Sequence, residues 1–416
     1  MRRIALAALA AAALASACAG PEAGPAELWT DVPELALAVE LFNASQERHL
    51  VVLRWQPSLA EAIRQAKLPP ALAVGRYLKS QELRERFRGL DGLVRKLDLG
   101  QEAFYPALLE LGNIEGRQLL LPVSFNLPAI VFARGAARVG DDFVLGMADM
   151  APAAAAYNRK EGGAYSRMGF SPRWDPGFLA LLVSAEGAGF REGKPLAWDE
   201  GGLAAGLAAA SSWVSSTNGP AEEEDEFQFK YLYTPAYQYA ASGRTLFACV
   251  DSSEFFTIPE EKRASLDYRW FAASGGSVPV SEDIVYAAVP RAGRGQRAAR
   301  AFLAWFFRED SQRALLELSQ ETRAIDASFG VAGGFSSIRA VNEKDFPRFY
   351  SALVGHMPPA GGLAAPKVLP SDWPELKAEA LGPWLVEATG RRVPPADPGA
   401  ELAARIAEQR KRAAQR

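Results

Sequence analysis

Short apolar runs and amphipathic segments alternate through residues 27–74. The runs are rich in β-branched and bulky side chains and end at polar, Gly or Pro residues, a pattern typical of strands. The segments between them carry apolar residues at helical spacing, and Pro33 and Ser58 are both favourable at a helix start. The predicted order is strand 27–31, helix 34–45, strand 49–54, helix 59–67 and strand 71–74. Strands that alternate with helices in this way predict a parallel α/β sheet.

A second apolar stretch, residues 119–135, has a different pattern. Two strand-like runs, 119–121 and 129–133, flank a polar island formed by Ser124 and Asn126. An unpaired polar group in a buried strand costs about 1–3 kcal/mol, so these side chains either pair within the protein or face a cleft. We predict that the stretch crosses between two lobes, with the polar island at the hinge and with Asn126 as the residue that contacts a ligand.

The N-terminus has the pattern of an export signal. Met-Arg-Arg precedes an apolar run over residues 4–17, which is too short to span a bilayer as a helix. Ala15-Ser16-Ala17-Cys18 resembles a bacterial lipobox, in which the Cys is acylated, although Leu14 stands one position early. We expect a lipoprotein anchored at Cys18 and tethered by residues 19–26, and plain signal cleavage is the alternative.

Composition narrows the chemistry that the chain can carry. With Cys18 acylated, Cys249 is alone, so no disulfide or cysteine metal site can form within the chain. There are two His and no H-E-x-x-H, and we find no G-x-S-x-G, no P-loop and no G-x-G-x-x-G after a strand. A formal net charge of −3 provides no overall field to attract nucleic acid. We predict a non-enzymatic protein with no metal, no cofactor and no nucleic-acid partner.

The length of the chain, 416 residues, points to two domains, because single cores rarely grow past about 250–300 residues. Hydrophobic residues make up 49% of the sequence, which is enough for a sizeable core. No run after the signal is long and apolar enough to span a bilayer, so we expect the mature body outside the cytoplasm. The acidic run 222–226 is interpreted as a solvated loop.

Candidate ligand contacts follow from the predicted sheet. Ligands in parallel α/β sheets bind beyond the carboxyl ends of the strands. This rule points to Trp29 and Asp31 after the first strand and to Arg76 after the third. In the later segment G-F-S-P-R-W-D-P, Arg173 and Trp174 stand at the start of a predicted helix, a position suited to polar or anionic contacts.

The second half of the chain adds two candidates. Asp251 follows a predicted strand, and Trp373 ends the segment L-P-S-D-W. The other elements expected here are a Tyr-rich helix at 231–242, a strand at 243–250, a return strand pair at 277–290, an apolar helix at 298–307 and a closing helix with a basic end at 401–416. We expect the return pair to lie against the crossover stretch 119–135.

Several of these segments together resemble a known family. They are a strand ending in W-x-D, a helix reading A-V-E-L-F-N, a strand L-V-V-L, a Pro-led third strand, and L-P-V-S-F-N-L-P-A-I-V-F. In this order they are similar to the extracellular solute-binding lipoproteins of ABC transporters, in the carbohydrate-binding branch that includes the maltose-binding protein family. The helix A-A-R-A-F-L-A-W-F-F also matches. The chain departs from the family at Phe247, where relatives carry Met, and at D-S-S over 251–253, where they carry G-x-W.

The resemblance implies an α/β, type II periplasmic-binding-protein fold with two lobes, each a mainly parallel sheet flanked by helices, joined by hinge strands. The implied division is signal peptide 1–18, tether 19–26, N-terminal lobe 27–125 and 280–325, and C-terminal lobe 126–279 and 326–416. The implied function is capture of a sugar or oligosaccharide between the lobes and delivery to membrane permease subunits by a monomer anchored on the periplasmic or cell-surface side of the cytoplasmic membrane.

The candidate ligand-binding residues are Trp29, Asp31, Arg76, Asn126, Arg173, Trp174, Asp251 and Trp373. Aromatic faces stack on sugars, and Asp, Asn and Arg can bond to vicinal hydroxyls. Structural roles are the alternatives: core packing for Trp29 and Trp373, helix capping for Asp31 and Asp175, a hydrophobic staple for Trp174 and a solvated surface position for Arg76. At the level of function, a structural or adhesive lipoprotein without a transport ligand and a binder of a non-sugar anionic solute remain alternatives.

Overall fold

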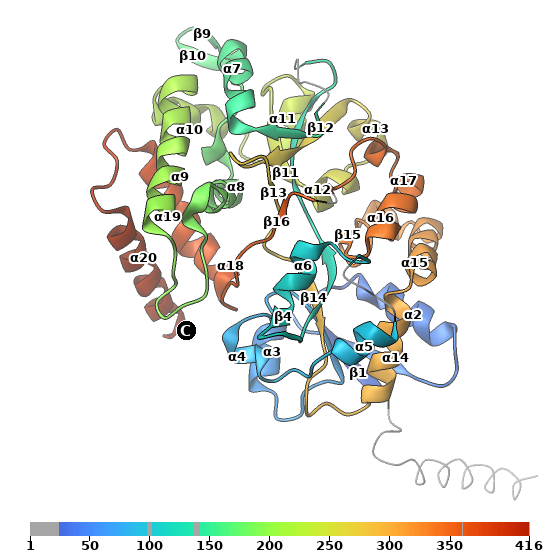
Figure 1. Ribbon diagram of the computed structural model, residues 1–416. Coiled ribbons are helices and arrows are strands. Elements are labelled where there is room, and N and C mark those ends of the chain that lie inside the picture. The colour runs from blue at the N-terminus through green and yellow to red at the C-terminus, as the bar shows by residue number, and fades with distance from the viewer. Residues whose placement is uncertain (1–24, 98–101, 137–141, 360, 416) are drawn as a thin grey trace, which may run out of the picture.

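The computed structural model describes residues 25–97, 102–136, 142–359 and 361–415. The predicted signal peptide and Cys18 lie outside these residues. Figure 1 shows two α/β lobes connected by strands that cross between them. None of the helices in the described ranges has both the length and the apolar character needed to cross a membrane.

The first lobe is built on a mixed six-stranded sheet. Its order is β15 (Phe335–Ser336), β6 (Leu121–Phe125), β14 (Val285–Ala288), β3 (Leu72–Gly75), β1 (Ala26–Thr30) and β2 (Val51–Trp55). The three strands predicted from residues 27–74 are present and parallel, with Leu28 beside both Leu53 and Leu72. Every one of the four residues of β3 is buried, as expected for a central strand covered on both faces.

Helices cover both faces of the first sheet (Figure 1). They are α2 (Leu35–Ala44), α3 (Leu59–Gln65), α4 (Gln81–Arg84), α5 (Asp91–Lys96), α6 (Pro106–Leu111), α14 (Gln296–Phe306), α15 (Glu309–Glu321), α16 (Arg339–Lys344) and α17 (Phe346–Phe349). The predicted apolar helix at 298–307 is α14, whose Phe302 and Phe306 are buried in the core. A short hairpin, β4 (Asn113–Ile114) and β5 (Arg117–Gln118), precedes β6.

The second lobe contains a four-stranded sheet in the order β11 (Ala248–Asp251), β7 (Pro128–Ala133), β12 (Leu266–Ala272) and β8 (Val144–Gly146), plus a hairpin of β9 (Arg159–Glu161) and β10 (Ala164–Arg167). Its helices are α7 (Met147–Tyr157), α8 (Pro176–Val183), α9 (Glu200–Trp213), α10 (Ala221–Phe229), α11 (Ala236–Ala241), α12 (Ser252–Thr257), α13 (Glu260–Arg263), α18 (Trp373–Leu376), α19 (Gly382–Gly390) and α20 (Pro398–Ala413). The predicted closing helix is α20.

Three segments cross between the lobes. The first joins β6 to β7 through Asn126, and the second joins β12 to β14 through β13 (Val278–Pro279). The third returns to the second lobe through β16 (Leu363–Ala364), which pairs with β13 (Figure 1). β6 pairs with β14 in antiparallel register, Ser124 beside Val285. The predicted pairing of the crossover stretch with the return segment is therefore confirmed.

Aromatic side chains pack one side of the hinge region. Phe256 of α12 stacks on Phe329, with ring centroids 4.5 Å apart. Phe335 of β15 lies edge-on to Trp270 of β12 at 5.7 Å. These contacts join the two lobes into one continuous apolar cluster, whereas a second cluster belongs to the C-terminal lobe. The lobes are thus held together on one side, and any cleft must open on the other.

Two expectations about the sheets and lobes need correction. Neither sheet is mainly parallel: β14 and β6 are antiparallel to their neighbours in the first, and β7 is antiparallel to both neighbours in the second. Successive crossings between the lobes run in opposite directions. Strands that lead out of a lobe therefore pair in antiparallel fashion with strands that return to it. The predicted return to the C-terminal lobe at residue 326 is also too early, because β15 still pairs with β6 in the first sheet.

The acidic run 222–226 is a helix rather than a loop. It lies within α10, with Glu222 and Glu223 in the first turn, where negative charge favours the positive end of the helix dipole. Glu224 is completely buried. The predicted Tyr-rich helix at 231–242 is only half formed, because α11 begins at Ala236.

Candidate functional site

Asp31 and Arg76 meet at the carboxyl edge of the first sheet. The sequence analysis assigned both to the carboxyl ends of strands, and the structure brings them side by side because β1 and β3 are adjacent and parallel. The backbone N–H of Arg76 donates to both Asp31 carboxylate oxygens at 3.2 and 3.3 Å, and Arg76 Nη1 donates to the Asp31 carbonyl at 3.1 Å. Burial raises the pKa of Asp31, although the neighbouring guanidinium opposes that shift. The pair forms a polar corner in which the partly buried Arg76 guanidinium is held against Asp31.

The residues around this corner are tightly constrained. A Cβ at Gly75 would lie 2.3 Å from the Asp31 carboxylate, so only glycine allows this close approach. Tyr77 adopts a left-handed backbone conformation (φ 56°), which is unusual for a bulky residue and often marks functional sites. Its side chain extends from the first lobe and packs against the hydrophobic cluster of the second lobe. Tyr77 therefore bridges the lobes beside Arg76.

A polar triplet in the second crossing, Ser281, Glu282 and Asp283, connects most of the predicted site. Arg76 Nε lies 3.6 Å from Asp283 Oδ2. Trp373 Nε1 donates to Glu282 Oε2 at 2.7 Å, and Lys377 Nζ donates to the same oxygen at 2.6 Å. The triplet thus reaches both the first lobe and the last helices of the second.

Ser281 reaches two further candidates. Its hydroxyl donates to Asp251 Oδ2 at 2.6 Å, and its backbone N–H donates to the carbonyl of Asn126 at 2.9 Å. Burial and the nearby Asp283 carboxylate raise the pKa of Asp251 to about 6. Five of the eight candidate residues are therefore gathered around one hinge segment.

The polar island of the first crossing ties the hinge together. Asn126 Nδ2 donates to the Gly333 carbonyl at 2.9 Å, and its Oδ1 accepts from the Ser252 hydroxyl at 2.7 Å. The Ser124 hydroxyl donates to the Ala332 carbonyl at 2.8 Å. Both side chains are buried and pair within the protein. Asn126 lies at the base of the site as a hinge residue.

A cleft of about 1410 Å³ opens between the lobes next to Arg76 and Tyr77. The first lobe contributes α3, α4 and the strand ends, and the second contributes the loop at 192–194, α18 and the end of α20. The charged side chains among its described lining residues are Asp31, Glu61, Arg64, Arg76, Glu82, Glu192, Lys194, Asp372, Glu375 and Arg410. Tyr77 is the only aromatic residue in this lining. The walls already touch, since the backbone N–H of Gln81 donates to both Glu192 carboxylate oxygens at 2.9 Å.

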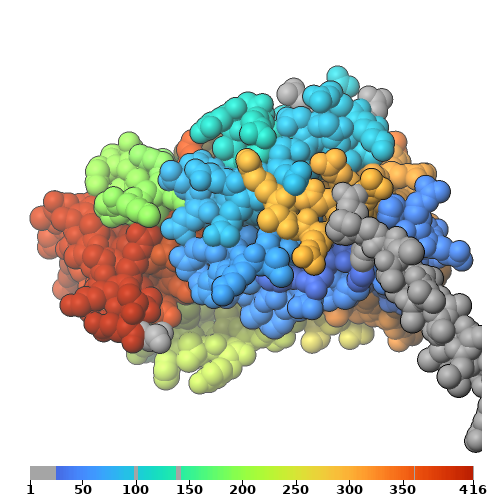
Figure 2. Space-filling model, turned by 90° about the horizontal axis from the view of Figure 1, so that it is seen from below, coloured from blue at the N-terminus to red at the C-terminus, as the bar shows by residue number. Residues whose placement is uncertain are grey.

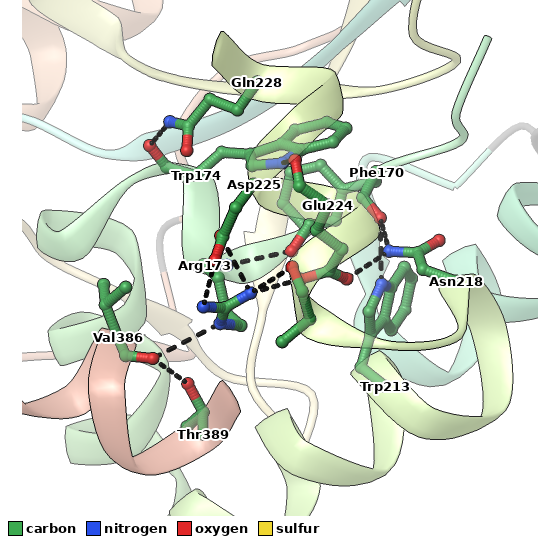
Figure 3. Close-up of polar contacts among 12 residues, drawn as sticks. Phe170, Arg173, Trp174, Trp213, Asn218, Glu224, Asp225, Gln228, Val386 and Thr389 are labelled. Atoms are coloured by element: carbon green, nitrogen blue, oxygen red, sulfur yellow. Dashed lines mark hydrogen bonds and ion pairs between the residues drawn. The ribbon is translucent and has the colours of Figure 1, made fainter. Parts of the chain in front are cut away.

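Arg173 is buried and Trp174 is partly buried within the second lobe (Figure 3). Arg173 is 5% exposed, and its guanidinium contacts Glu224 at 3.0 Å, Asp225 at 3.1 Å and the carbonyl of Val386 at 3.3 Å. Trp174 stacks on Phe227, and its Nε1 donates to the Glu224 carbonyl at 3.3 Å. Neither lines the cleft between the lobes.

Glu224 is the centre of this buried group. It accepts from Asn218 Nδ2 at 2.6 Å in addition to Arg173. Burial raises the pKa of Glu224, while the bonds from Asn218 and Arg173 oppose the shift. We call Arg173, Asn218 and Glu224 the second-lobe knot. Because every partner comes from the second lobe, we infer that the knot stabilises that lobe and takes no part in the cleft.

Trp29 and Trp373 are not exposed aromatic platforms. Trp29 lies inside β1, beside Arg54 and Ala73, and its Nε1 donates to Glu27 at 3.1 Å. Trp373 is fully buried and presents only its N–H to Glu282. The side chains missed by the sequence reasoning are Tyr77 and the triplet at 281–283. The triplet is a polar island between apolar runs, the same signal that drew attention to Ser124 and Asn126.

Searches of the sequence against protein-family models and against curated proteins found no match. Solved structures do match over nearly the whole chain. A cyclic α-maltosyl-1,6-maltose binding protein from Arthrobacter globiformis has a TM-score of 0.64 at 16% identity, covering 94% of this chain and 100% of its own. An ABC substrate-binding protein from Listeria monocytogenes in complex with cycloalternan has a TM-score of 0.61 at 10% identity, covering 93% and 98%.

A maltose/maltodextrin-binding domain from Bdellovibrio bacteriovorus bound to maltotriose also matches, with a TM-score of 0.59 at 12% identity and coverage of 94% and 100%. At such low identity these matches define the fold. The chain has the two-lobe α/β fold of type II periplasmic binding proteins, and the expected fold class is confirmed. The neighbours with this fold are substrate-binding proteins rather than enzymes.

Proposed function

We propose that this chain is the solute-binding protein of an ABC importer and that it captures a sugar or oligosaccharide between its lobes. The observation that carries the proposal is the polar cluster at 281–283, which links Arg76 of the first lobe to Asp251 and Trp373 of the second beside a cleft of about 1410 Å³. Pockets for small molecules usually measure about 300–1,000 Å³. A cleft above that range suits an oligosaccharide better than a single small metabolite.

The charge of the cleft favours a neutral polyhydroxylated solute over an anion. Its lining contains six carboxylates and four basic side chains. Asp251 and Asp283 add two further carboxylates nearby, close enough that Asp283 helps to raise the pKa of Asp251. Carboxylates accept hydrogen bonds from hydroxyl groups but repel anions. The alternative of an anionic solute is therefore disfavoured.

Closure of the lobes on the solute is the proposed mechanism. The aromatic cluster around Phe256 and Phe335 joins the lobes on one side and acts as the pivot. On the other side, Gln81 and Glu192 bring the walls together. Closure removes water from the site, which strengthens each hydrogen bond to the solute. Tyr77 would supply the aromatic face, with Arg76, Asp31 and Asp251 as polar contacts.

Anchoring and delivery complete the proposal. Cys18 would be acylated and would hold the body at the outer side of the cytoplasmic membrane through residues 19–26. The closed protein would then dock on permease subunits in the membrane, which receive the solute. The sequence pattern M-R-R, apolar run and A-S-A-C supports this part of the proposal.

A thermal-shift screen with mono- and oligosaccharides, sugar acids included, tests the proposal. A bound sugar at 100 times its Kd stabilises the folded state by about 2.7 kcal/mol, which raises Tm by several degrees. Arg76→Gln should weaken the binding of the sugar identified by tenfold or more, since hydrogen bonds to charged groups contribute about 1.5–3 kcal/mol.

The matched control is Arg54→Gln, which removes an arginine from the neighbouring strand β2. Arg54 pairs with Glu27 on the surface and does not line the cleft. It should leave sugar affinity unchanged. A screen in which no carbohydrate changes Tm, or equal affinity losses for both variants, would contradict the proposal.

A further inference from the structure

Four arginine side chains surround a pocket of about 440 Å³ on the first lobe. They are Arg88, Arg117, Arg291 and Arg300, and all four are exposed. Within the described part of the chain, none of them forms an ion pair with a carboxylate. Arg88 Nε and Nη2 donate to the Arg291 carbonyl at 3.2 and 2.7 Å, and Arg291 Nε donates to the Phe87 carbonyl at 3.0 Å. The four positive charges converge, and the Asp91 carboxylate is nearby without pairing to them: a Cβ at Gly89 would lie 2.9 Å from Asp91 Oδ2 and 3.4 Å from Arg117 Nη2.

The surrounding surface is basic as well. An adjoining pocket of about 430 Å³ is lined by His49, Lys96, Arg297 and Arg300, among others. Residues 284–308 contain five arginines and no acidic residue. Like charges placed this close repel each other. We call the surface formed by Arg88, Lys96, Arg117, Arg291, Arg297 and Arg300 the arginine face.

Two residues of the arginine face lie at a helix end where positive charge is unfavourable. Arg297 and Arg300 lie in the first turns of α14, which has no acidic residue in its first turn. The N-terminus of a helix carries a partial positive charge, so cations there are unfavourable. The neighbouring α15 follows the favourable pattern, with Glu309 and Asp310 in its first turn. A bound anion would neutralise Arg300 and the N-terminal end of α14.

The arginine face lies where the described chain begins, at the edge of the sheet opposite the cleft. A Cβ at Gly295 would be 3.0 Å from Cα of Ala26, the first residue of β1. A Cβ at Gly293 would be 2.0 Å from the carbonyl oxygen of Pro70, just before β3. Figure 2 shows the orange chain around residues 291–300 beside the light blue chain that carries Arg88. Since β1 and β3 run from this edge toward Asp31 and Arg76, the arginine face and the cleft are at opposite ends of the strands.

We propose that the arginine face is a docking surface for anionic phospholipid headgroups. Guanidinium groups bind phosphate oxygens through paired hydrogen bonds, and several basic residues together hold a protein on an anionic membrane surface. The proposal rests on the proposed lipid anchor for one point only: eight residues from Cys18 to Ala26 reach about 28 Å at most, which keeps this face near the bilayer. Docking here directs the cleft away from the membrane, an arrangement for capturing solute that the protein must leave before it delivers the solute to the permease.

Vesicle binding of the purified chain 19–416 tests the proposal without the anchor. Both hydrophobic clusters are built from residues 26–406, so this chain contains the whole folded body. We expect it to bind vesicles of phosphatidylcholine with phosphatidylglycerol, not vesicles of phosphatidylcholine alone, and to be released by added NaCl because salt screens the charges. Arg117→Gln with Arg300→Gln should lower the partition coefficient by about 25-fold, since each basic residue near the surface contributes about fivefold.

The control is Arg244→Gln with Arg392→Gln, which removes the same charge from exposed positions of the second lobe. It should leave vesicle binding unchanged, and both double variants should keep the wild-type Tm. Equal vesicle binding by the two double variants would overturn the proposal. Stabilisation of the chain by inorganic phosphate without any vesicle binding would also overturn it, in favour of a free-phosphate site. Neither outcome depends on whether a sugar binds in the cleft, so the two proposals can fail separately.

Discussion

The polar cluster between the lobes and the second-lobe knot use the same residue types in opposite ways. In the knot, Arg173 and Glu224 are buried, matched in charge and saturated by partners from one lobe. In the interlobe cluster, Asp251 and Asp283 bring like charges together, and Arg76 is shared between Asp31 and Asp283 at distances near 4 Å. The knot has no capacity left for a ligand, whereas the interlobe cluster has acceptors and donors to offer.

The origin of the partners distinguishes a structural from a functional polar group. Both contain an arginine near a strand or helix end, and both contain aromatic neighbours. What separates them is the origin of the partners, because a group assembled from both lobes changes when the lobes move. A group assembled within one lobe does not.

The largest effect is expected from removing the carboxylate at the centre of the second-lobe knot. Glu224→Ala leaves the Arg173 guanidinium and the Asn218 amide without their main acceptor in a buried site. We expect a loss of about 3–5 kcal/mol in the free energy of unfolding, as for other broken buried pairs. Urea unfolding followed by circular dichroism measures it. Sugar affinity per folded molecule should stay unchanged.

Glu226→Ala is the matched control, because Glu226 stands two residues later on α10 and is exposed. It should change stability by less than about 0.5 kcal/mol. If the two variants unfold at the same urea concentration, or if Glu224→Ala alters sugar affinity, the assignment of the knot to structure alone is wrong.

A smaller effect is expected from the pH dependence of the interlobe cluster. The pKa of Asp251 is raised to about 6 from 3.8, so between pH 4 and 6 the unfolded chain releases this proton and the folded chain retains it. The stability contributed by this group therefore falls as pH rises through that window, by about 2–3 kcal/mol. Asp251→Asn has no carboxyl group to ionise at this position and so does not lose this stability. Its free energy of unfolding relative to the wild type should rise from pH 4 to 6 and then level off.

Asp283→Asn serves as the control for the cause of this shift. Without the Asp283 charge, the pKa of Asp251 moves closer to its usual value. The difference in unfolding free energy between Asp283→Asn and the double variant Asp283→Asn with Asp251→Asn should therefore vary less with pH than the difference between the wild type and Asp251→Asn. Unfolding free energies at a series of pH values measure both. The same pH-dependent difference with and without the Asp283 charge would show that the two carboxylates are not coupled.

The smallest effect concerns the contact between the cleft walls. Glu192→Ala removes the acceptor of the Gln81 N–H, a partly exposed contact with a net contribution of about 0.5–1 kcal/mol. We expect a two- to fivefold shift toward the open arrangement, visible as a larger radius of gyration in small-angle scattering. Lys194→Ala is the control, because Lys194 is 91% exposed and lies 3.8 Å from Glu82; such pairs contribute little. Identical scattering of all three proteins would rule out a role for Glu192 in closure.

Sequence periodicity was sufficient for the three parallel strands of the first sheet and for the crossover. The alternation of strands and helices over residues 27–74 predicted parallel β1, β2 and β3 and placed Asp31 and Arg76 at strand ends, whereas their meeting depends on the adjacency of β1 and β3 in the sheet. The polar island at Ser124 and Asn126 indicated a hinge because unpaired polar groups are too costly in a buried strand. These are local signals, and short-range physics determines them.

Other features depended on contacts between distant segments. Arg173 and Trp174 have the sequence pattern of a ligand-binding loop. Only the packing of α10 against them shows that the Arg173 guanidinium is paired with Glu224 and that the Trp174 ring is stacked on Phe227. The acidic run 222–226 has the composition of a solvated loop, and its helix depends on a buried partner that lies 51 residues away in sequence.

The sequence by itself therefore determined the fold class, the order of the first strands and the polar residues at their ends, because strand and helix periods and strand-end chemistry are properties of single segments. Tertiary structure decided which polar residues share a site. Arg76, Asp251 and Trp373 are far apart along the chain, and they are joined only where Ser281, Glu282 and Asp283 pass between the lobes. A pairing of that kind arises from three crossings packed side by side, and no local pattern contains it.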